Sequence, residues 1–124
     1  MAEHNELGEK GENAAIEFLL QNGYKILETN WTYGRKEIDI IAQDRDILVI
    51  IEVKTRQTDF FGEPEEFVSN QKQILLIKAA NAYILLKKLN LEVRFDIISI
   101  VKNPDKTKIN HIKDAFYPKV RRWN

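Results

Sequence analysis

Two acidic residues and a neighbouring lysine are spaced so that they could form a site for a cation. Asp39 lies in the segment 36–42, and Glu52 and Lys54 lie in the segment 47–56. Carboxylate oxygens are the ligands that hard divalent cations prefer. If the two segments are neighbouring strands, Asp39 and Glu52 could bridge one such ion, and Lys54 would lie beside it on the same strand as Glu52.

Both segments have the composition of β-strands. They are rich in β-branched residues, and the polar connection 43–46 has the size that closes a β-hairpin. A turn centred on residues 44 and 45 implies the pairs Gln43 with Asp46, Asp39 with Ile50 and Glu37 with Glu52. Because opposed residues share a face of the sheet, this register gathers Glu37, Asp39 and Glu52 on one side.

Three acids on one face of a sheet would repel one another. Like charges that face one another across a sheet are destabilising, and each raises the pKa of the others unless a cation offsets the repulsion. A site for a hard cation is one explanation. The alternative is a solvated sheet face on which Glu52 and Lys54 form an ordinary exposed ion pair, which contributes little to stability.

A helix is predicted from about residue 7 to residue 22. Small and apolar residues recur on one stripe, which lets the helix lie close to a sheet, and Gly23 is placed to end the helix as a C-terminal cap. With about 100° of rotation per residue, Glu12 falls beside the small stripe and can face the hairpin. The alternative is a surface carboxylate on a solvated helix flank.

The remaining elements complete an α/β domain. We expect a strand over 24–31, a second helix from the N-cap Ser69 to about residue 88, a strand over 92–101 and a short edge strand over 108–112, with residues 115–117 folding back on the core. The order αβββαβ predicts a mixed sheet with flanking helices. The chain 1–124 is expected to be a single domain, with a core over about 7–117 and a basic tail over 118–124.

Three features outside the acidic cluster could contact nucleic acid. Lys72 lies near a helix N-terminus, which favours phosphate, although a lysine that only covers the core fits the same pattern. Phe60 and Phe61 either anchor the loop 57–66 on the core, which we prefer, or stack with bases. The chain from Lys102 onward is rich in lysine and arginine, which either contact phosphate or keep the tail solvated.

Composition excludes several classes of function. The 124 residues contain no cysteine, which removes disulfides, thiolate metal sites and cysteine nucleophiles, and the two histidines, His4 and His111, are far apart in the sequence. No apolar run is long enough to span a membrane, and the start lacks the pattern of a secretory signal, so we expect a cytoplasmic protein. The net charge of zero argues mildly against a broad nucleic-acid surface, which needs a basic patch.

The ordered set of motifs resembles a nuclease superfamily. An acid on the first helix, an aspartate on the second strand and Glu-x-Lys on the third resemble the PD-(D/E)xK nucleases, which have the restriction-endonuclease-like fold. More closely, the chain looks like a member of the YraN family of uncharacterised bacterial proteins, which is similar to the archaeal Holliday junction resolvases. The resemblance rests on Gly11-Glu12-Asn13-Ala14-Ala15, Asn30-Trp31, Glu37-Ile38-Asp39-Ile40-Ile41, Glu52-Val53-Lys54-Thr55-Arg56, Phe61-Gly62 and Arg94-Phe95-Asp96. Lys36 departs from the family, which usually has glycine there.

The resemblance implies a metal-dependent endonuclease that hydrolyses DNA, with branched DNA such as Holliday junctions as the substrate, in repair or recombination. Carried onto this sequence, Asp39 and Glu52 would bind Mg²⁺ or Mn²⁺, and Glu12 would hold a metal-bound water or complete a second metal site. Lys54 would orient or help to deprotonate the attacking water, or stabilise charge on the phosphate. The candidate contacts to nucleic acid are Lys72, Arg56 and Lys36. A homodimer would suit a branched substrate. The alternative is a non-catalytic nucleic-acid-binding module on the same fold.

Overall fold

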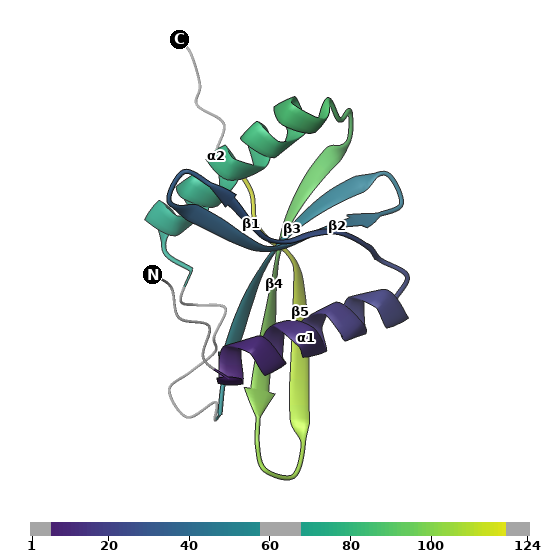
Figure 1. Cartoon of the computed structure of the whole chain (residues 1–124), viewed down its shortest axis with the longest axis vertical. Coiled ribbons are helices and arrows are strands. Elements are labelled where there is room, and N and C mark those ends of the chain that lie inside the picture. Colours follow the sequence, from purple (N-terminus) through teal and green to yellow (C-terminus); the bar gives the residue numbers. More distant parts are fainter. Residues whose placement is uncertain (1–5, 58–67, 119–124) are drawn as a thin grey trace.

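The computed structural model describes residues 6–57 and 68–118, which form two helices and five strands (Figure 1). In chain order they are α1 (Glu6–Gln21), β1 (Lys25–Tyr33), β2 (Lys36–Asp44), β3 (Ile47–Arg56), α2 (Asn70–Lys87), β4 (Glu92–Lys102) and β5 (Thr107–Phe116). The strands make one sheet in the order β1-β2-β3-β4-β5. Within it, β3 and β4 are parallel and the other neighbours are antiparallel. The predicted α/β class and mixed sheet with flanking helices are confirmed.

Each face of the sheet is covered by one helix. The helix α2 packs on a cluster that includes Ile41 and Ile50, and α1 packs on a cluster that includes Val49 and Ile51. Figure 1 shows the two helices on opposite sides of the strands. Because β3 is buried on both faces over residues 48–51, it is apolar throughout this stretch instead of alternating apolar and polar residues.

Both helices are capped as the sequence predicts. After α1, Gly23 adopts a φ of 86°, in the left-handed region that suits glycine, and the Tyr24 amide donates to the Leu19 carbonyl at 3.0 Å. At the start of α2, the Ser69 hydroxyl accepts a hydrogen bond from the Lys72 amide at 3.1 Å. Neither helix is long and apolar enough to cross a membrane. The capped residue, Lys72, therefore lies in the first turn of α2.

The β2–β3 hairpin has a different register from the predicted one. Asp44 pairs with Ile47, so the turn is formed by Arg45 and Asp46, and Arg45 adopts a left-handed φ of 60°. Asp44 is held in the strand by Arg94 of β4, whose Nη1 lies 3.3 Å from Asp44 Oδ2. The predicted pairs Gln43 with Asp46, Asp39 with Ile50 and Glu37 with Glu52 are therefore wrong. Gln43 pairs with Leu48 and Ile41 with Ile50, and the ladder ends at Ile40 and Ile51, before it reaches Asp39 or Glu37.

The last strand is longer than the predicted edge strand. It runs from Thr107 to Phe116 along β4, with a break in register between the partners of Phe95 and Ile97. Asp114 has a φ of 56° at this break, and the irregular backbone lets the strand resume at Phe116. The Phe116 ring stacks on Phe95 with 5.2 Å between the centroids. The segment expected to fold back on the core thus packs there as part of the strand.

Candidate functional site

Asp39 lies where β2 and β3 separate. The last pair of their ladder is Ile40 with Ile51, and Asp39 comes just beyond it. Residues two apart in a strand normally share a face, but Ile38 belongs to the cluster under α2 and Ile40 to the cluster under α1. Asp39 Oδ2 accepts a hydrogen bond from the Val53 amide at 2.8 Å. The carboxylate therefore bridges the gap between the two strands.

Glu52 is held by two lysines. Its side chain is only 5% exposed, and its Oε2 accepts a hydrogen bond from Lys72 Nζ of α2. Lys54 Nζ lies 3.6 Å from the same oxygen, which is the distance of an ion pair and too long for a hydrogen bond.

The two lysines differ in how strongly they interact with Glu52. Burial alone would lower the pKa of Lys72, but the hydrogen bond and the charge of Glu52 outweigh burial and raise this pKa. For Lys54, burial and the positive charge of Lys72 lower the pKa, and the opposing effect of Glu52 is smaller. Lys72 is therefore the main partner of the buried carboxylate, and Lys54 is the second.

The pKa of Asp39 is raised to about 7, chiefly by burial and next by the negative charge of Glu52. The charge of Glu12 adds to the increase, whereas the Val53 amide and the Lys72 ammonium oppose it. Between about pH 4 and pH 7, Asp39 is therefore mostly protonated in the folded protein and mostly ionised in the unfolded chain. Ionised Asp39 destabilises the folded protein as the pH rises from the ordinary pKa of an aspartate, about 4, towards the folded value. A nearby cation would offset this cost.

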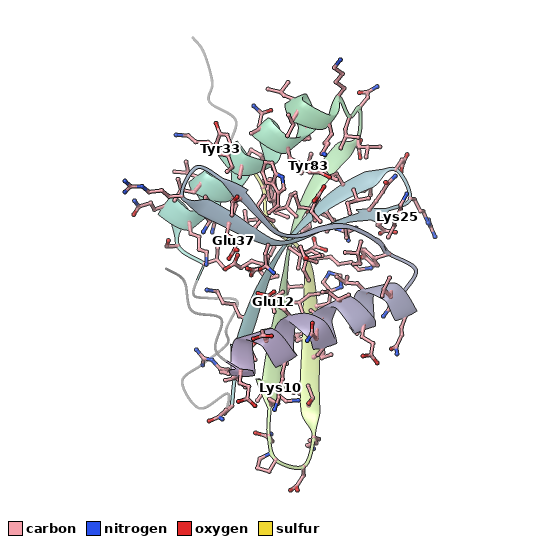
Figure 2. All side chains as sticks on the ribbon, viewed as in Figure 1. Lys10, Glu12, Lys25, Tyr33, Glu37 and Tyr83 are labelled. Carbon is pink, nitrogen blue, oxygen red and sulfur yellow. The ribbon has the colours of Figure 1, made fainter. Side chains whose placement is uncertain are left out.

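Close packing of α1 on β3 positions Glu12. A Cβ at Gly11 would lie 2.0 Å from Thr55 Oγ1 and 2.8 Å from Thr55 Cβ, so only glycine permits this approach of the helix to the strand. Figure 2 shows Glu12 extending from α1 towards the strands. Its charge raises the pKa of Asp39, which places the acid of α1 within electrostatic reach of the gap between β2 and β3.

Gly11→Ala is expected to lower the free energy of unfolding by about 1–3 kcal/mol, the usual cost of overpacking. Alanine is the better helix former by about 1 kcal/mol, but the contact with Thr55 cannot be relieved without moving the helix. Urea unfolding of the parent, Gly11→Ala, Thr55→Gly and the double variant measures the effect. Since Thr55→Gly removes the clashing atoms, the double variant should recover part of the loss. Strictly additive losses would contradict the close approach.

Most of the predicted site residues meet in one region. The residues linked there by hydrogen bonds, ion pairs or charge are Glu12, Asp39, Glu52, Lys54, Lys72 and Lys36. The pKa of Lys36 is lowered by burial and by the charge of Lys72. Arg56 lies at the end of β3, opposite Val101 of β4. Phe60, Phe61 and the tail from Lys119 lie outside the described residues.

The acids of this region do not form a ready-made cage for a metal. Within residues 6–57 and 68–118, no three aspartate, glutamate or histidine side chains are grouped so that they could hold a metal ion. The Glu52 carboxylate is instead paired with Lys72 and Lys54. The cluster consequently has a cation in it already, in the form of a lysine ammonium.

A second polar cluster surrounds Asp96 of β4, whose side chain is fully buried. Its carboxylate lies 2.9 Å from both Nε and Nη2 of Arg94 and 2.7 Å from His111 Nε2, and it accepts a hydrogen bond from the Asp114 amide at 2.9 Å. Burial alone would raise the pKa of Asp96, but the hydrogen bonds from His111, Arg94 and Asp114 lower it. An aspartate inside an apolar strand signals buried partners, but the sequence does not reveal which residues they are.

The fold and the first cluster define an α/β protein with acids and lysines gathered where two strands of its sheet separate. The chain belongs to UPF0102, an uncharacterised protein family whose model matches residues 11–100. It is 56% identical over 117 residues to a UPF0102 protein of Flavobacterium psychrophilum, which covers 94% of this chain and 98% of the relative. It is 48% identical over 118 residues to a UPF0102 protein of Bacteroides thetaiotaomicron, which covers 95% of this chain and 98% of the relative. The YraN-like family expected from the motifs is confirmed.

Proposed function

We propose that this protein is a metal-dependent endonuclease that hydrolyses phosphodiester bonds in DNA, on a restriction-endonuclease-like fold of the PD-(D/E)xK superfamily. The observation that carries the proposal is the meeting of Asp39 and the buried Glu52 where β2 and β3 separate, with Lys54 3.6 Å from Glu52; the raised pKa of Asp39 agrees with it. Strongly perturbed acids of this kind concentrate at functional sites. The substrate class suggested by the family resemblance is branched DNA such as a Holliday junction, in repair or recombination.

The acids present fit a hard divalent cation. Mg²⁺ usually keeps several waters and takes only one or two carboxylates, so Asp39 and Glu52 would hold Mg²⁺ or Mn²⁺, with the Val53 carbonyl as a further ligand. Glu12 of α1 would hold a metal-bound water or complete a second metal site. When bound, the ion would supply a Lewis acid and lower the pKa of a water molecule.

The basic residues would act on water and on phosphate. Lys54 lies 3.6 Å from Glu52, and burial lowers its pKa, which favours a role in orienting or deprotonating the attacking water. Lys36 and Arg56, on neighbouring strands, would contact the phosphates on either side of the scissile bond. Lys72 would stabilise negative charge from the N-terminal end of α2.

A homodimer belongs to this proposal, because two sites related by a two-fold axis would face the two strands of a branched substrate. Light scattering of the protein alone and mixed with a four-way DNA junction measures the stoichiometry. Two copies on one junction support the arrangement, and one copy on each junction contradicts it.

A non-catalytic nucleic-acid-binding module on the same fold is the second candidate. It is favoured by the pairing of Glu52 with Lys72 and by the lack of a three-ligand metal group among the described residues. Such a module binds DNA in gel-shift experiments, with an affinity that falls as salt rises, and leaves the DNA intact in every divalent cation tested. An endonuclease produces cut strands when Mg²⁺ or Mn²⁺ is added.

Asp39→Asn tests the metal site without a nuclease assay. In metal-free buffer at neutral pH, the variant should be more stable than the parent by about 1–2 kcal/mol, because it removes a carboxylate whose ionisation is costly and keeps an acceptor for the Val53 amide. The gain should vanish below about pH 4, where the parent carboxyl is protonated in both states. Added Mn²⁺ should raise the Tm of the parent and leave that of the variant unchanged.

Asp46→Asn is the matched control, because it removes an exposed carboxylate from the turn of the same hairpin. Its Tm and its response to Mn²⁺ should equal those of the parent. Equal shifts with Mn²⁺ in the parent and in Asp39→Asn would show that Asp39 is not a ligand.

A further inference from the structure

Lys72 contacts an oxygen of Glu52, one of the two carboxylates proposed above as metal ligands. Its Nζ donates a hydrogen bond to Glu52 Oε2, and its charge lowers the pKa of Asp39, the other proposed ligand. One ammonium group therefore interacts with both carboxylates. It comes from α2, whereas both acids belong to the hairpin, and the Lys72 side chain remains 28% exposed.

We propose that Lys72 is a built-in competitor of the divalent cation, which holds Glu52 in the metal-free protein and leaves it when the ion binds. Released from Glu52, the ammonium becomes available to a phosphate of the nucleic acid. This inference rests on the proposed function, because it takes Glu52 and Asp39 as the metal ligands.

The crowding of positive charge at Glu52 explains why the lysine must leave. Oε2 already lies near two ammonium groups, since Lys54 Nζ is 3.6 Å away and Lys72 donates directly to it. A divalent ion on the same carboxylate would bring three cations to one buried acid, and like charges at such distances repel strongly in a partly dry site. Lys72 blocks the oxygen through its hydrogen bond, so it is Lys72 that competes for the ligand atom.

The geometry also allows Lys72 to move without unfolding the helix. The residue lies in the first turn of α2, where the Ser69 cap binds its backbone amide and not its side chain, so the cap can persist when the side chain leaves Glu52. A lysine has a flexible four-carbon stem with a compact charge at its end, so a change of rotamer carries the ammonium to solvent or to a phosphate. Metal binding should therefore raise the affinity for phosphate, and phosphate binding should raise the affinity for metal by the same factor.

Lys72→Met tests the competition by a binding measurement that does not depend on cleavage. The variant keeps an unbranched apolar stem and loses the charge, so isothermal titration with Mn²⁺ should give a Kd about tenfold lower than that of the parent, within the usual range of coupling between sites. Lys78→Met is the matched control: it removes a charge from an exposed position of the same helix and should bind Mn²⁺ as the parent does. A Kd for Lys72→Met that equals or exceeds the parent value overturns the competition.

The result also separates this inference from the metal site itself. If the parent binds Mn²⁺ and Asp39→Asn does not, the site stands, and the Kd of Lys72→Met alone decides the role of Lys72. If neither the parent nor Lys72→Met binds Mn²⁺, the proposed site is wrong and the competition is wrong with it. Should Lys72→Met fail to fold in metal-free buffer, Lys72→Gln replaces it, because its amide can still donate to Glu52 without carrying a charge.

Discussion

Glu52→Gln is expected to abolish metal-dependent cleavage of DNA, with a rate loss of at least about a hundredfold. Loss of a residue that only supports a metal ligand already costs about 10–100-fold, so loss of a buried ligand should cost more. Glutamine keeps the shape of a side chain that is 5% exposed, and its amide oxygen can still accept from Lys72, so the fold should survive. Branched, nicked and linear DNA incubated with Mg²⁺ or Mn²⁺ and analysed on denaturing gels gives the rate.

Lys54→Met should also lose cleavage, but for a different reason. The lysine is not a ligand, so the variant should still respond to Mn²⁺ in a melting experiment while it fails to cut. Glu92→Gln, at an exposed position at the start of β4, is the control and should cut at the parent rate. Glu52→Gln and Lys54→Met variants that cut as fast as the parent would refute the assignment. A parent protein that binds DNA and never cuts it is the non-catalytic module.

Asp96→Asn should lower the free energy of unfolding by about 3–5 kcal/mol, the usual result of removing one partner of a buried ion pair. The carboxylate is fully buried, and the Arg94 side chain that it pairs with is only 15% exposed, so the guanidinium would be left without its main counter-charge. His111, whose ring nitrogen lies 2.7 Å from the same carboxylate, would face a neutral amide in its place. Urea unfolding at neutral pH measures the loss.

The loss caused by Asp96→Asn should shrink in acid. The pKa of Asp96 is lowered in the folded protein, because its hydrogen bonds from His111, Arg94 and the Asp114 amide outweigh the effect of burial. A lowered pKa contributes stability that is complete above the unfolded value of about 4 and is lost as the pH falls below it towards the folded value. The unfolding curves of parent and variant should converge in that range. The Asp46→Asn control, at an exposed position of the turn, should unfold at the same urea concentration as the parent throughout. A constant difference between Asp96→Asn and the parent down to low pH would exclude a charged Asp96.

Local sequence signals predict the elements of this fold and fail at the hairpin register. Gly23 and Ser69 act through their own backbone neighbours, so their capping roles can be predicted from sequence alone. The turn is formed by Arg45 and Asp46, and Asp44 remains in the strand, where it contacts Arg94 of β4, a residue 50 positions away in the sequence. A contact over that separation is not visible in the local pattern from which the register was predicted.

The sequence predicts which residues form the candidate site, but it does not predict which of them contact one another. The alternation of side chains brings Glu52 and Lys54 to one face, as expected for a strand. The break in alternation at Asp39 and the hydrogen bond to Val53 arise where the two strands part, which the sequence does not mark. Lys72 was expected near phosphate, and its contact with Glu52 appears only when α2 is packed on the sheet.

The connection between β3 and β4 has a consequence for the order of assembly. These parallel strands can pair only after the chain has crossed over through α2, whereas the β2–β3 hairpin closes through a short turn. Lys72 is 20 positions from Glu52 and reaches it only when that crossover is complete. A nascent hairpin thus carries Glu52 with Lys54 as its ion-pair partner, and docking of α2 is the step that adds Lys72.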